Sequence, residues 1–429
     1  MVTKHKHHYM PRIYDELLQR RLSAKGAVLV EGPKWCGKTT TCEQLANSTL
    51  YLADPTTRSQ NLLLAETQPS FLLAGATPRL IDEWQLAPQL WDSIRFEVDQ
   101  RGTAGQFLLT GSSVPPQLSR IAHTGTGRIA RMRMRPMSLY ESGDSSGATS
   151  LGDLFNGQSL QPLHAEATIE RIAFLLCRGG WPGAIGFNNE QDALQQAVDY
   201  IDAVVESDIS RVDDVERDPH LARRLMRSYA RMESSQTSLA QITADVAGND
   251  STPSSKTVQS YVRALEKIFV IEDLPAWNPN LRSKTAIRSA DTRHFTDPSL
   301  AAAALGVNPQ GALRDLETFG LLFESMCVRD LRVYADALDG QVFHYRDKTD
   351  LECDAVIHLR DGRYALIEVK LGGDRLVNEG AANLIKLANR IDTSTMMQPS
   401  FLMVLTGTGA YSYTRPDGVI VAPITTLRP

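Results

Sequence analysis

Gly32-Pro-Lys-Trp-Cys-Gly-Lys-Thr39 is the stretch that decides the fold of the N-terminal part of this chain. It follows the apolar run Ala27-Val-Leu-Val30 and opens a helical pattern that continues through Leu45. The spacing G-x-x-x-x-G-K-[ST] between a strand and a helix is typical of a loop that binds phosphates. Its glycines allow backbone N–H groups to surround phosphate oxygens, the Lys38 ammonium bridges the β- and γ-phosphates, and Thr39 offers a hydroxyl to Mg²⁺. The sequence therefore predicts a nucleoside triphosphate site made of Gly32, Pro33, Lys34, Trp35, Cys36, Gly37, Lys38, Thr39 and Thr40.

A second motif, Leu80-Ile-Asp-Glu83, indicates how a bound triphosphate would be hydrolysed. An apolar strand that ends in two carboxylates places Asp82 near the magnesium ion and Glu83 where it polarises an attacking water. The alternative is a pair of solvated surface acids. The next strand ends in Leu108-Leu-Thr-Gly-Ser-Ser113, so Thr110 and Ser112 are candidate sensors of the γ-phosphate, unless this segment is a plain turn.

Around these motifs, short apolar runs alternate with helical or turn stretches. Such alternation predicts a parallel sheet covered by helices. Gly127-Arg128 precedes the last run, and Arg128 is a candidate arginine finger for the nucleotide of a neighbouring subunit. Arg131, Arg133 and Arg135 alternate along that run and are expected to line an exposed strand. The runs are Ala27 to Val30, Leu50 to Leu52, Arg79 to Ile81, Phe107 to Leu109 and Ile129 to Met134.

A second constellation of charged residues lies near the C-terminus. Glu352-Cys-Asp354 and Glu368-Val-Lys370 occupy two predicted strands joined by a turn, and the preceding helical stretch carries Glu324. Period-two geometry puts Glu368 and Lys370 on one face, with Asp354 beside them across the hairpin. Three acids and a lysine can bind Mg²⁺, with Asp354 and Glu368 as ligands, and activate a water for phosphodiester cleavage. A structural salt-bridge cluster is the alternative.

Four parts of the chain are predicted from these patterns. They are a P-loop core (1–160) that ends in a flexible Gly- and Ser-rich connection from Glu141 to Gly157, a helical lid or connector (161–236), a winged helix (237–300) and a second α/β domain (301–429). The winged helix would consist of two short helices on either side of residues 248–255 and a strand at Phe269-Val-Ile271. Basic residues on and after its second helix would contact DNA phosphates; they are Lys256, Arg263, Lys267, Arg282, Lys284, Arg288 and Arg293.

The composition is that of a soluble protein. The 429 residues include 45 Lys and Arg against 50 Asp and Glu, so the net charge of −5 neither requires nor excludes DNA. The five cysteines are scattered, without CxxC or zinc spacing, which favours a reducing compartment. No run of 18 apolar residues is present. We therefore expect a cytoplasmic protein without a membrane partner.

As a set, these motifs resemble those of bacterial and archaeal AAA+ superfamily ATPases. Further markers shared with that group are Gly179-Gly-Trp-Pro182, His294-Phe-Thr-Asp-Pro298 and Gly320-Leu-Leu-Phe-Glu324. The resemblance implies an N-terminal P-loop domain, a winged helix, and a C-terminal domain of unknown function with a restriction-endonuclease-like, or PD-(D/E)XK, core. The chain departs from the group at Trp35-Cys36, where smaller residues are usual; Trp35 is expected to restrict access to the phosphates or pack over the base, and thereby to slow turnover.

Three functional hypotheses follow. The first is an ATPase that uses ATP and Mg²⁺ and couples nucleotide state to the winged helix and the C-terminal domain. The second adds duplex DNA as substrate of the C-terminal acids. The third is a nucleotide-dependent signalling switch or scaffold with a silent nuclease-like domain. A trans-acting Arg128 would require a nucleotide-dependent homo-oligomer.

Overall fold

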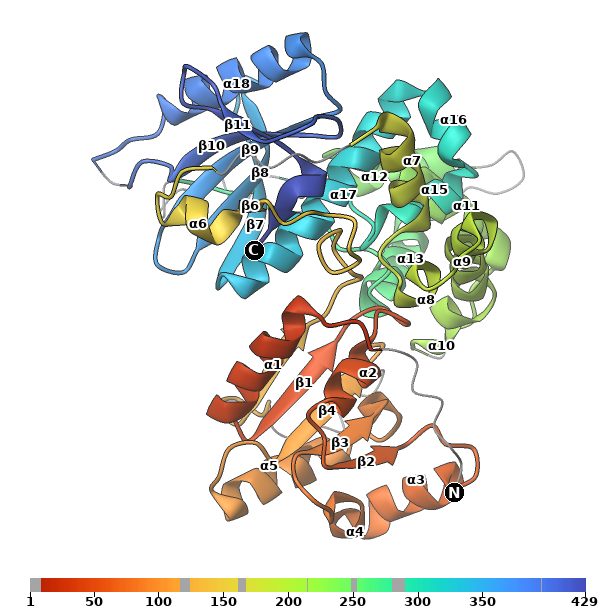
Figure 1. The fold of residues 1–429 in the computed structure, drawn as a ribbon. Helices are drawn as coiled ribbons and strands as arrows, with labels where there is room; N and C mark the ends of the chain where they lie inside the picture. The colour runs from red at the N-terminus through yellow and green to blue at the C-terminus, as the bar shows by residue number, and fades with distance from the viewer. Residues whose placement is uncertain are drawn as a thin grey trace. The chain divides into compact units, whose positions relative to one another are not determined.

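The chain folds into two compact units (Figure 1). In the computed structural model, the described residues are 9–115, 124–160, 167–213, 215–247, 253–279, 290–394 and 396–429. The N-terminal unit comprises Met1–Pro136 and two later segments, Ser207–Arg217 and Arg263–Phe269. The C-terminal unit contains the remaining residues. Among the described residues, no helix has both the length and the apolar character needed to cross a membrane.

The N-terminal unit is built on a five-stranded parallel sheet, as the apolar runs predict. Its spatial order is β2-β3-β4-β1-β5. Because all the strands run the same way, the residues that follow β1, β3 and β4 meet at one edge of the sheet. This edge therefore brings the residues after Glu31, Asp82 and Gly111 together. The strands are β1 (Ala27–Glu31), β2 (Ser48–Tyr51), β3 (Arg79–Asp82), β4 (Phe107–Gly111) and β5 (Ile129–Arg133).

Helices cover this sheet and bury its apolar side chains. Trp84 and Trp91 pack together with ring centroids 4.9 Å apart, and both are almost fully buried. They belong to a core that also contains Leu29, Ile81 and Phe107. The helices are α1 (Ile13–Ala24), α2 (Lys38–Glu43), α3 (Arg58–Thr67), α4 (Pro69–Leu73) and α5 (Leu90–Arg101).

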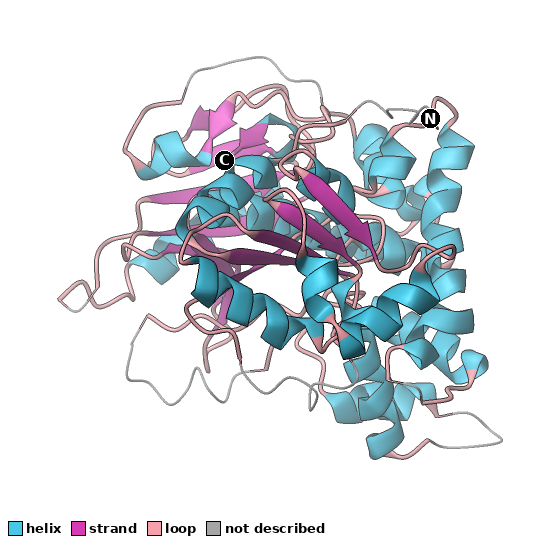
Figure 2. Ribbon diagram, turned by 90° about the horizontal axis from the view of Figure 1, so that it is seen from below, coloured by secondary structure: helices cyan, strands magenta, loops and turns pink. Residues whose placement is uncertain are grey.

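Most of the described residues between Ile169 and Ala337 are helical. Helices are drawn in cyan in Figure 2. The predicted winged-helix region contains two helices, α12 and α13. The predicted strand at 269–271 is reduced to an isolated bridge between Ile271 and Phe295. The helices are α7 (Ile169–Arg178), α8 (Pro182–Ile185), α9 (Glu190–Ala203), α10 (Ile209–Arg211), α11 (Pro219–Arg231), α12 (Leu239–Val246), α13 (Ser255–Lys267), α15 (Pro298–Leu305), α16 (Pro309–Arg314) and α17 (Leu316–Ala337).

The C-terminal sheet has six strands in the order β11-β12-β10-β9-β8-β7. β7, β8 and β9 are antiparallel neighbours, whereas β10 runs parallel to both β9 and β12. Helix α18 (Asp374–Ala388) packs on the face that carries Tyr364 and Leu366. The strands are β7 (Gly340–Arg346), β8 (Glu352–Leu359), β9 (Tyr364–Lys370), β10 (Phe401–Thr406), β11 (Tyr413–Thr414) and β12 (Ile420–Pro423).

The Gly- and Ser-rich stretch after the N-terminal sheet is not a loose connection, so that prediction is wrong. Ser145 is buried and donates a hydrogen bond from Oγ to the carbonyl of Leu427 over 2.6 Å. Strand β6 (Thr149–Ser150) pairs with β13 (Leu427–Arg428) and leads into α6 (Leu151–Phe155). Contacts with residues near the chain's C-terminal end therefore order a segment whose composition suggests flexibility.

Candidate functional site

The loop between β1 and α2 has a shape that its glycines make accessible. A Cβ atom added to Gly32 would lie 2.0 Å from the carbonyl oxygen of Met134, so a side chain cannot fit there. Gly37, directly before α2, has a φ of 102°, a conformation that side-chain-bearing residues rarely adopt. The backbone can thus turn sharply at both ends of the loop, as enclosure of a phosphate group requires.

Side chains outside the loop fix its path. Arg12 is buried and donates one hydrogen bond to the carbonyl of Cys36 (2.7 Å) and another to that of Arg135 (2.9 Å). Within the loop, the Lys38 ammonium donates to the carbonyl of Pro33 over 2.7 Å and is nearly inaccessible. The loop is therefore already folded around the position of the lysine. Sequence reasoning gave Arg12 no such role, because its partners are backbone carbonyls far along the chain.

Asp82 lies between two threonine hydroxyl groups. Its Oδ1 accepts hydrogen bonds from the hydroxyls of Thr39 and Thr110, each at 2.6 Å. Thr39 is the second residue of α2, while Asp82 and Thr110 come from the ends of β3 and β4. Hydroxyl and carboxylate oxygens are hard donors that suit Mg²⁺. The residues predicted to hold the metal are therefore adjacent, and their chemistry fits it.

Glu83 follows Asp82 and is held from two sides. Its backbone adopts a left-handed conformation with φ of 57°, and its N–H donates to Thr110 Oγ1 (3.2 Å). Its carboxylate accepts hydrogen bonds from Ser112 Oγ at 2.9 Å and from the amide of Gln85. Both Thr110 and Ser112 are buried. These two candidate sensors thus orient the paired acids, with Gln85 as a further partner.

The remaining loop residues have different surroundings. Trp35 has a φ of 65° and is 71% exposed, while Thr40 is also exposed. Lys34 forms an ion pair with Asp208, with 2.7 Å between Nζ and Oδ1. Asp208 belongs to one of the two later segments of the N-terminal unit and was not expected at this site.

Arg128 is not brought to the phosphate loop of its own chain. It precedes β5, which runs parallel to β1, whereas the loop follows β1, so the two lie at opposite edges of the sheet. Its guanidinium is half-exposed and pairs with Asp99 over 2.8 Å, and this hydrogen bond lowers the pKa of Asp99. A role for Arg128 at a nucleotide of another subunit stays a prediction.

The acids and lysine of the C-terminal sheet do converge. Lys370 Nζ lies 2.6 Å from Glu368 Oε2 and 3.3 Å from Asp354 Oδ2. Burial and the charge of Asp354 raise the pKa of Glu368 to about 8. Burial and Asp354 also raise the pKa of Glu324, on α17, well above its ordinary value. Although burial alone would lower the pKa of Lys370, the carboxylates of Asp354 and Glu368 raise it.

Asn383, on α18, completes this cluster and was missed from the sequence. Its amide donates to Glu368 Oε1 and to the carbonyl of Glu352, each at 2.7 Å. The only hint in the sequence is that Asn383 precedes Leu384, which lies on the buried face of an amphipathic helix. No group of three or more His, Cys, Asp or Glu side chains suited to a metal ion occurs in the part of the chain that the structure describes.

The predicted DNA-contacting residues are only partly described. Lys256 and Arg263 are exposed on α13. Lys267 lies 3.5 Å from Asp213, and Arg293 is mostly buried and paired with Asp273. Arg282, Lys284 and Arg288 lie outside the described residues.

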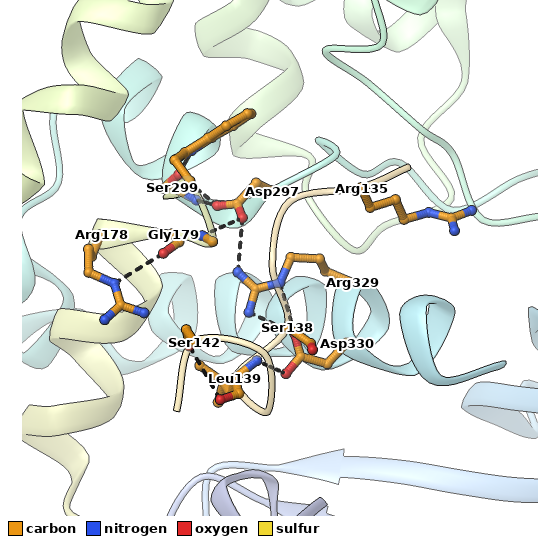
Figure 3. Close-up of polar contacts among 12 residues, drawn as sticks. Arg135, Ser138, Leu139, Ser142, Arg178, Gly179, Asp297, Ser299, Arg329 and Asp330 are labelled. Carbon is orange, nitrogen blue, oxygen red and sulfur yellow. Dashed lines mark hydrogen bonds and ion pairs between the residues drawn. The ribbon is translucent and has the colours of Figure 1, made fainter. Parts of the chain in front are cut away.

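Each of the markers at residues 179–182 and 294–298 contributes a residue to a buried ion cluster, Gly180 from the first and Asp297 from the second (Figure 3). Arg329 pairs with Asp297 (2.9 Å) and Asp330 (2.7 Å), and all three side chains are almost fully buried. The second oxygen of Asp330 accepts from the N–H of Leu139, and Asp297 accepts from that of Gly180, each at 2.9 Å. These buried contacts hold backbone segments together.

Comparison with known proteins adds three family matches. Residues 24–142 match an AAA domain model, residues 169–311 match a domain of unknown function (DUF8612), and residues 319–427 match another (DUF4143).

The chain is 23% identical over 358 residues to uncharacterized proteins of Mycobacterium tuberculosis and Mycobacterium bovis, covering 82% of this chain and 72% of each relative. A Walker-type ATPase of Pyrococcus abyssi is similar with a TM-score of 0.43 and 12% identity, over 69% of this chain and 96% of that one. The Hef helicase domain of Pyrococcus furiosus gives a TM-score of 0.21 and 13% identity, over 92% of this chain and 89% of that one. The AAA domain match, together with the parallel sheet and the loop geometry, supports a P-loop ATPase core within the N-terminal unit.

Proposed function

We propose that this protein binds ATP with Mg²⁺ and hydrolyses it at the loop between β1 and α2. The observation that carries the proposal is the convergence of three strand ends. Thr39 and Thr110 both donate to Asp82, and Ser112 holds the adjacent Glu83. The hydroxyl of Thr39 and the acids Asp82 and Glu83, which we propose as metal ligand and water-orienting group, therefore lie close to the loop between β1 and α2.

Each residue has a separate task in this scheme. The loop N–H groups and Lys38 would bind the phosphates, and their positive potential would stabilise charge that builds up during hydrolysis. Thr39 and Asp82 would hold Mg²⁺, which when bound neutralises part of the triphosphate charge. Glu83 would accept a hydrogen bond from the attacking water and orient it for attack.

Two substitutions test this function. Lys38→Ala should abolish ATP binding, measured by isothermal titration of the full chain with Mg²⁺. Glu83→Gln should leave binding intact and reduce phosphate release by about 10²-fold or more, because a neutral amide cannot accept the proton. Glu97→Gln, which changes an acid paired with Arg101 on α5, is the matched control. Normal phosphate release from both Lys38→Ala and Glu83→Gln would refute the proposal.

A second candidate function concerns the C-terminal sheet. We propose that its core is restriction-endonuclease-like and that α12 and α13 form part of a winged helix. The order of helix α17, antiparallel strands β7 to β9, helix α18 and parallel strand β10 supports this, as does the approach of Lys370 to Asp354 and Glu368. In an active form, Asp354 and Glu368 would bind Mg²⁺ beside a DNA phosphate, and Lys370 would position the water.

Plasmid nicking distinguishes an active cluster from a silent one. Active cleavage requires Mg²⁺-dependent nicking that Asp354→Ala removes and that Asp361→Ala, in an exposed turn, retains. Binding of duplex DNA should weaken steeply with salt and should depend on Lys256 and Arg263. An intact plasmid with wild-type protein would instead support a switch or scaffold, in which Lys370 and Asn383 keep the acids as a structural cluster.

Assembly is the third element of the proposal. Light scattering with and without a non-hydrolysable ATP analogue would show whether nucleotide drives homo-oligomer formation. An increase in mass that Arg128→Ala reduces would support its action on a neighbour's nucleotide. A constant monomer mass would exclude that role.

A further inference from the structure

We propose that the ion pair between Lys34 and Asp208 is a nucleotide-responsive contact, which ATP breaks by drawing Lys34 onto its phosphates. The inference rests on the proposed function, since it assigns a regulatory element to the same site. Its consequence is that Asp208 lowers the affinity for ATP and that segment Ser207–Arg217 reports whether the site is filled.

The first step is the position of Lys34. It lies two residues after Gly32 and four before Lys38, within the loop that would enclose the phosphates. Its side chain is 45% exposed and its ammonium is 2.7 Å from Asp208, whose side chain is only 12% exposed. A flexible four-carbon stem lets this ammonium turn toward a new anion without a change in the backbone.

The second step is competition between two anions. A triphosphate carries several negative charges, whereas Asp208 carries one, so a bound nucleotide attracts Lys34 more strongly. The γ-phosphate should matter most, because ADP brings less charge to the loop. Once Lys34 has moved, the phosphates and Asp208 repel each other, which pushes segment Ser207–Arg217 away from the loop.

The third step is a second contact from the catalytic edge to the same region. The N–H of Val114, two residues after Ser112, donates to the carbonyl of Lys267 over 2.9 Å. The Lys267 ammonium lies 3.5 Å from Asp213, which is itself held by Arg217 at 2.6 and 3.0 Å. Both later segments of the N-terminal unit are therefore linked to one another and to the two sides of the nucleotide site.

The backbone around Asp208 is also unusual. Val204–Asp208 forms a π-helical turn between α9 and α10, and such turns are frequent at functional sites. Asp208 is the last residue of this turn, so its side chain direction depends on the turn's irregular geometry. We regard Asp208 as a positioning residue that acts on the nucleotide only through Lys34.

The test compares the affinities of ATP and ADP in the full-length wild type and four variants by isothermal titration with Mg²⁺. Asp208→Asn should tighten ATP binding about three- to fivefold, the size expected for a partly exposed ion pair, and should change ADP binding less. Lys34→Gln should weaken ATP binding, and in the Lys34→Gln/Asp208→Asn double variant the effect of Asp208→Asn should vanish. Asp202→Asn, in α9 and paired with Arg223, is the matched control and should bind as wild type.

Hydrogen exchange provides a readout that a merely structural contact would not move. A non-hydrolysable ATP analogue should speed amide exchange at residues 207–213 in the wild type and should have no such effect in Lys34→Gln. ATP binding that Asp208→Asn does not tighten, an equal change in ATP and ADP binding, or unchanged exchange at 207–213 would each overturn the inference. If the wild type binds no nucleotide, the proposed function fails as well; if it binds ATP and Lys38→Ala does not, a failure concerns the Lys34–Asp208 pair alone.

Discussion

Glu233 is a carboxyl group that the fold keeps away from water. Its Oε1 accepts hydrogen bonds from Ser325 Oγ (2.6 Å) and the N–H of Phe295 (2.9 Å), and the side chain is fully buried. Burial raises the pKa of Glu233 to about 8. Beside it, burial lowers the pKa of His294 well below its ordinary value. The folded chain therefore favours neutral forms of both groups.

The pH dependence of stability should reflect Glu233. Because its pKa rises from 4.5 in the unfolded chain to about 8 in the fold, the stability it contributes is complete below pH 4.5 and is lost as pH rises through 8. Glu233→Gln removes this ionisation. Between pH 5 and 8 the free energy of unfolding, measured with urea, should fall about 2 to 4 kcal/mol less in Glu233→Gln than in wild type. Parallel curves for the two proteins would show that Glu233 titrates normally.

Ser112 is expected to affect turnover rather than binding. Its hydroxyl donates to Glu83, the proposed catalytic carboxylate, so Ser112→Ala should leave that carboxylate less well oriented. We expect kcat to fall about tenfold, within the range for a misplaced catalytic group, and the ATP affinity to stay within about twofold. Steady-state phosphate release and titration measure the two effects. Ser113→Ala is the control, and a loss of affinity without a loss of kcat would contradict this role.

At the scale of the elements, the close approach of the chain after β1 to the chain after β5 requires a glycine at position 32. An added Cβ at Gly32 meets the carbonyl of Met134, which is rigid backbone. Gly32→Ala should therefore separate the loop from the end of β5, lower the free energy of unfolding by about 1 to 3 kcal/mol and abolish ATP binding. Gly183→Ala, where an added Cβ meets nothing within 4 Å, should behave as wild type in the same thermal and binding measurements.

The strands and the phosphate loop could be predicted because their signals are local. Buried parallel strands appear as short apolar runs, and the loop has fixed spacing, so β1, β3 and β4 were expected within one or two residues. The composition of the segment from Glu141 to Gly157 predicts a flexible connection, whereas the segment is ordered by Leu427 and other distant partners. The contacts of Asn383 and Asp208 could not be predicted for the same reason, because their partners Glu368 and Lys34 are remote in sequence.

At the scale of a whole unit, Arg329 joins segments that are far apart in the chain. Arg329→Met would leave Asp297 and Asp330 buried without their cation, and the cost should be about 3 to 5 kcal/mol. Arg375→Met removes an exposed pair with Glu379 and should cost less than about 0.5 kcal/mol. Urea unfolding of both variants gives the comparison. Similar midpoints would mean that the buried cluster contributes little.

The sequence does not predict which later segments belong to the N-terminal unit. Local patterns do not show that Ser207–Arg217 and Arg263–Phe269 return to the N-terminal unit, because these returns depend on Asp208, Asp213 and Lys267 meeting distant partners. The candidate ATP site could be predicted from its motifs, whereas the residues that surround those motifs could not.

The two later segments of the N-terminal unit, Ser207–Arg217 and Arg263–Phe269, limit where the chain can be cut into separate fragments. A fragment that stops at Pro136 would contain the loop between β1 and α2, Asp82 and Glu83. It would lack Asp208 and Lys267, and with them the contacts that these residues make to Lys34 and Val114. The N-terminal unit therefore cannot be transferred to another protein as one continuous piece of sequence, because two later segments belong to it. Chimaeras with related chains should therefore tolerate exchange of the sheet domain only when residues 207–217 and 263–269 come from the same parent.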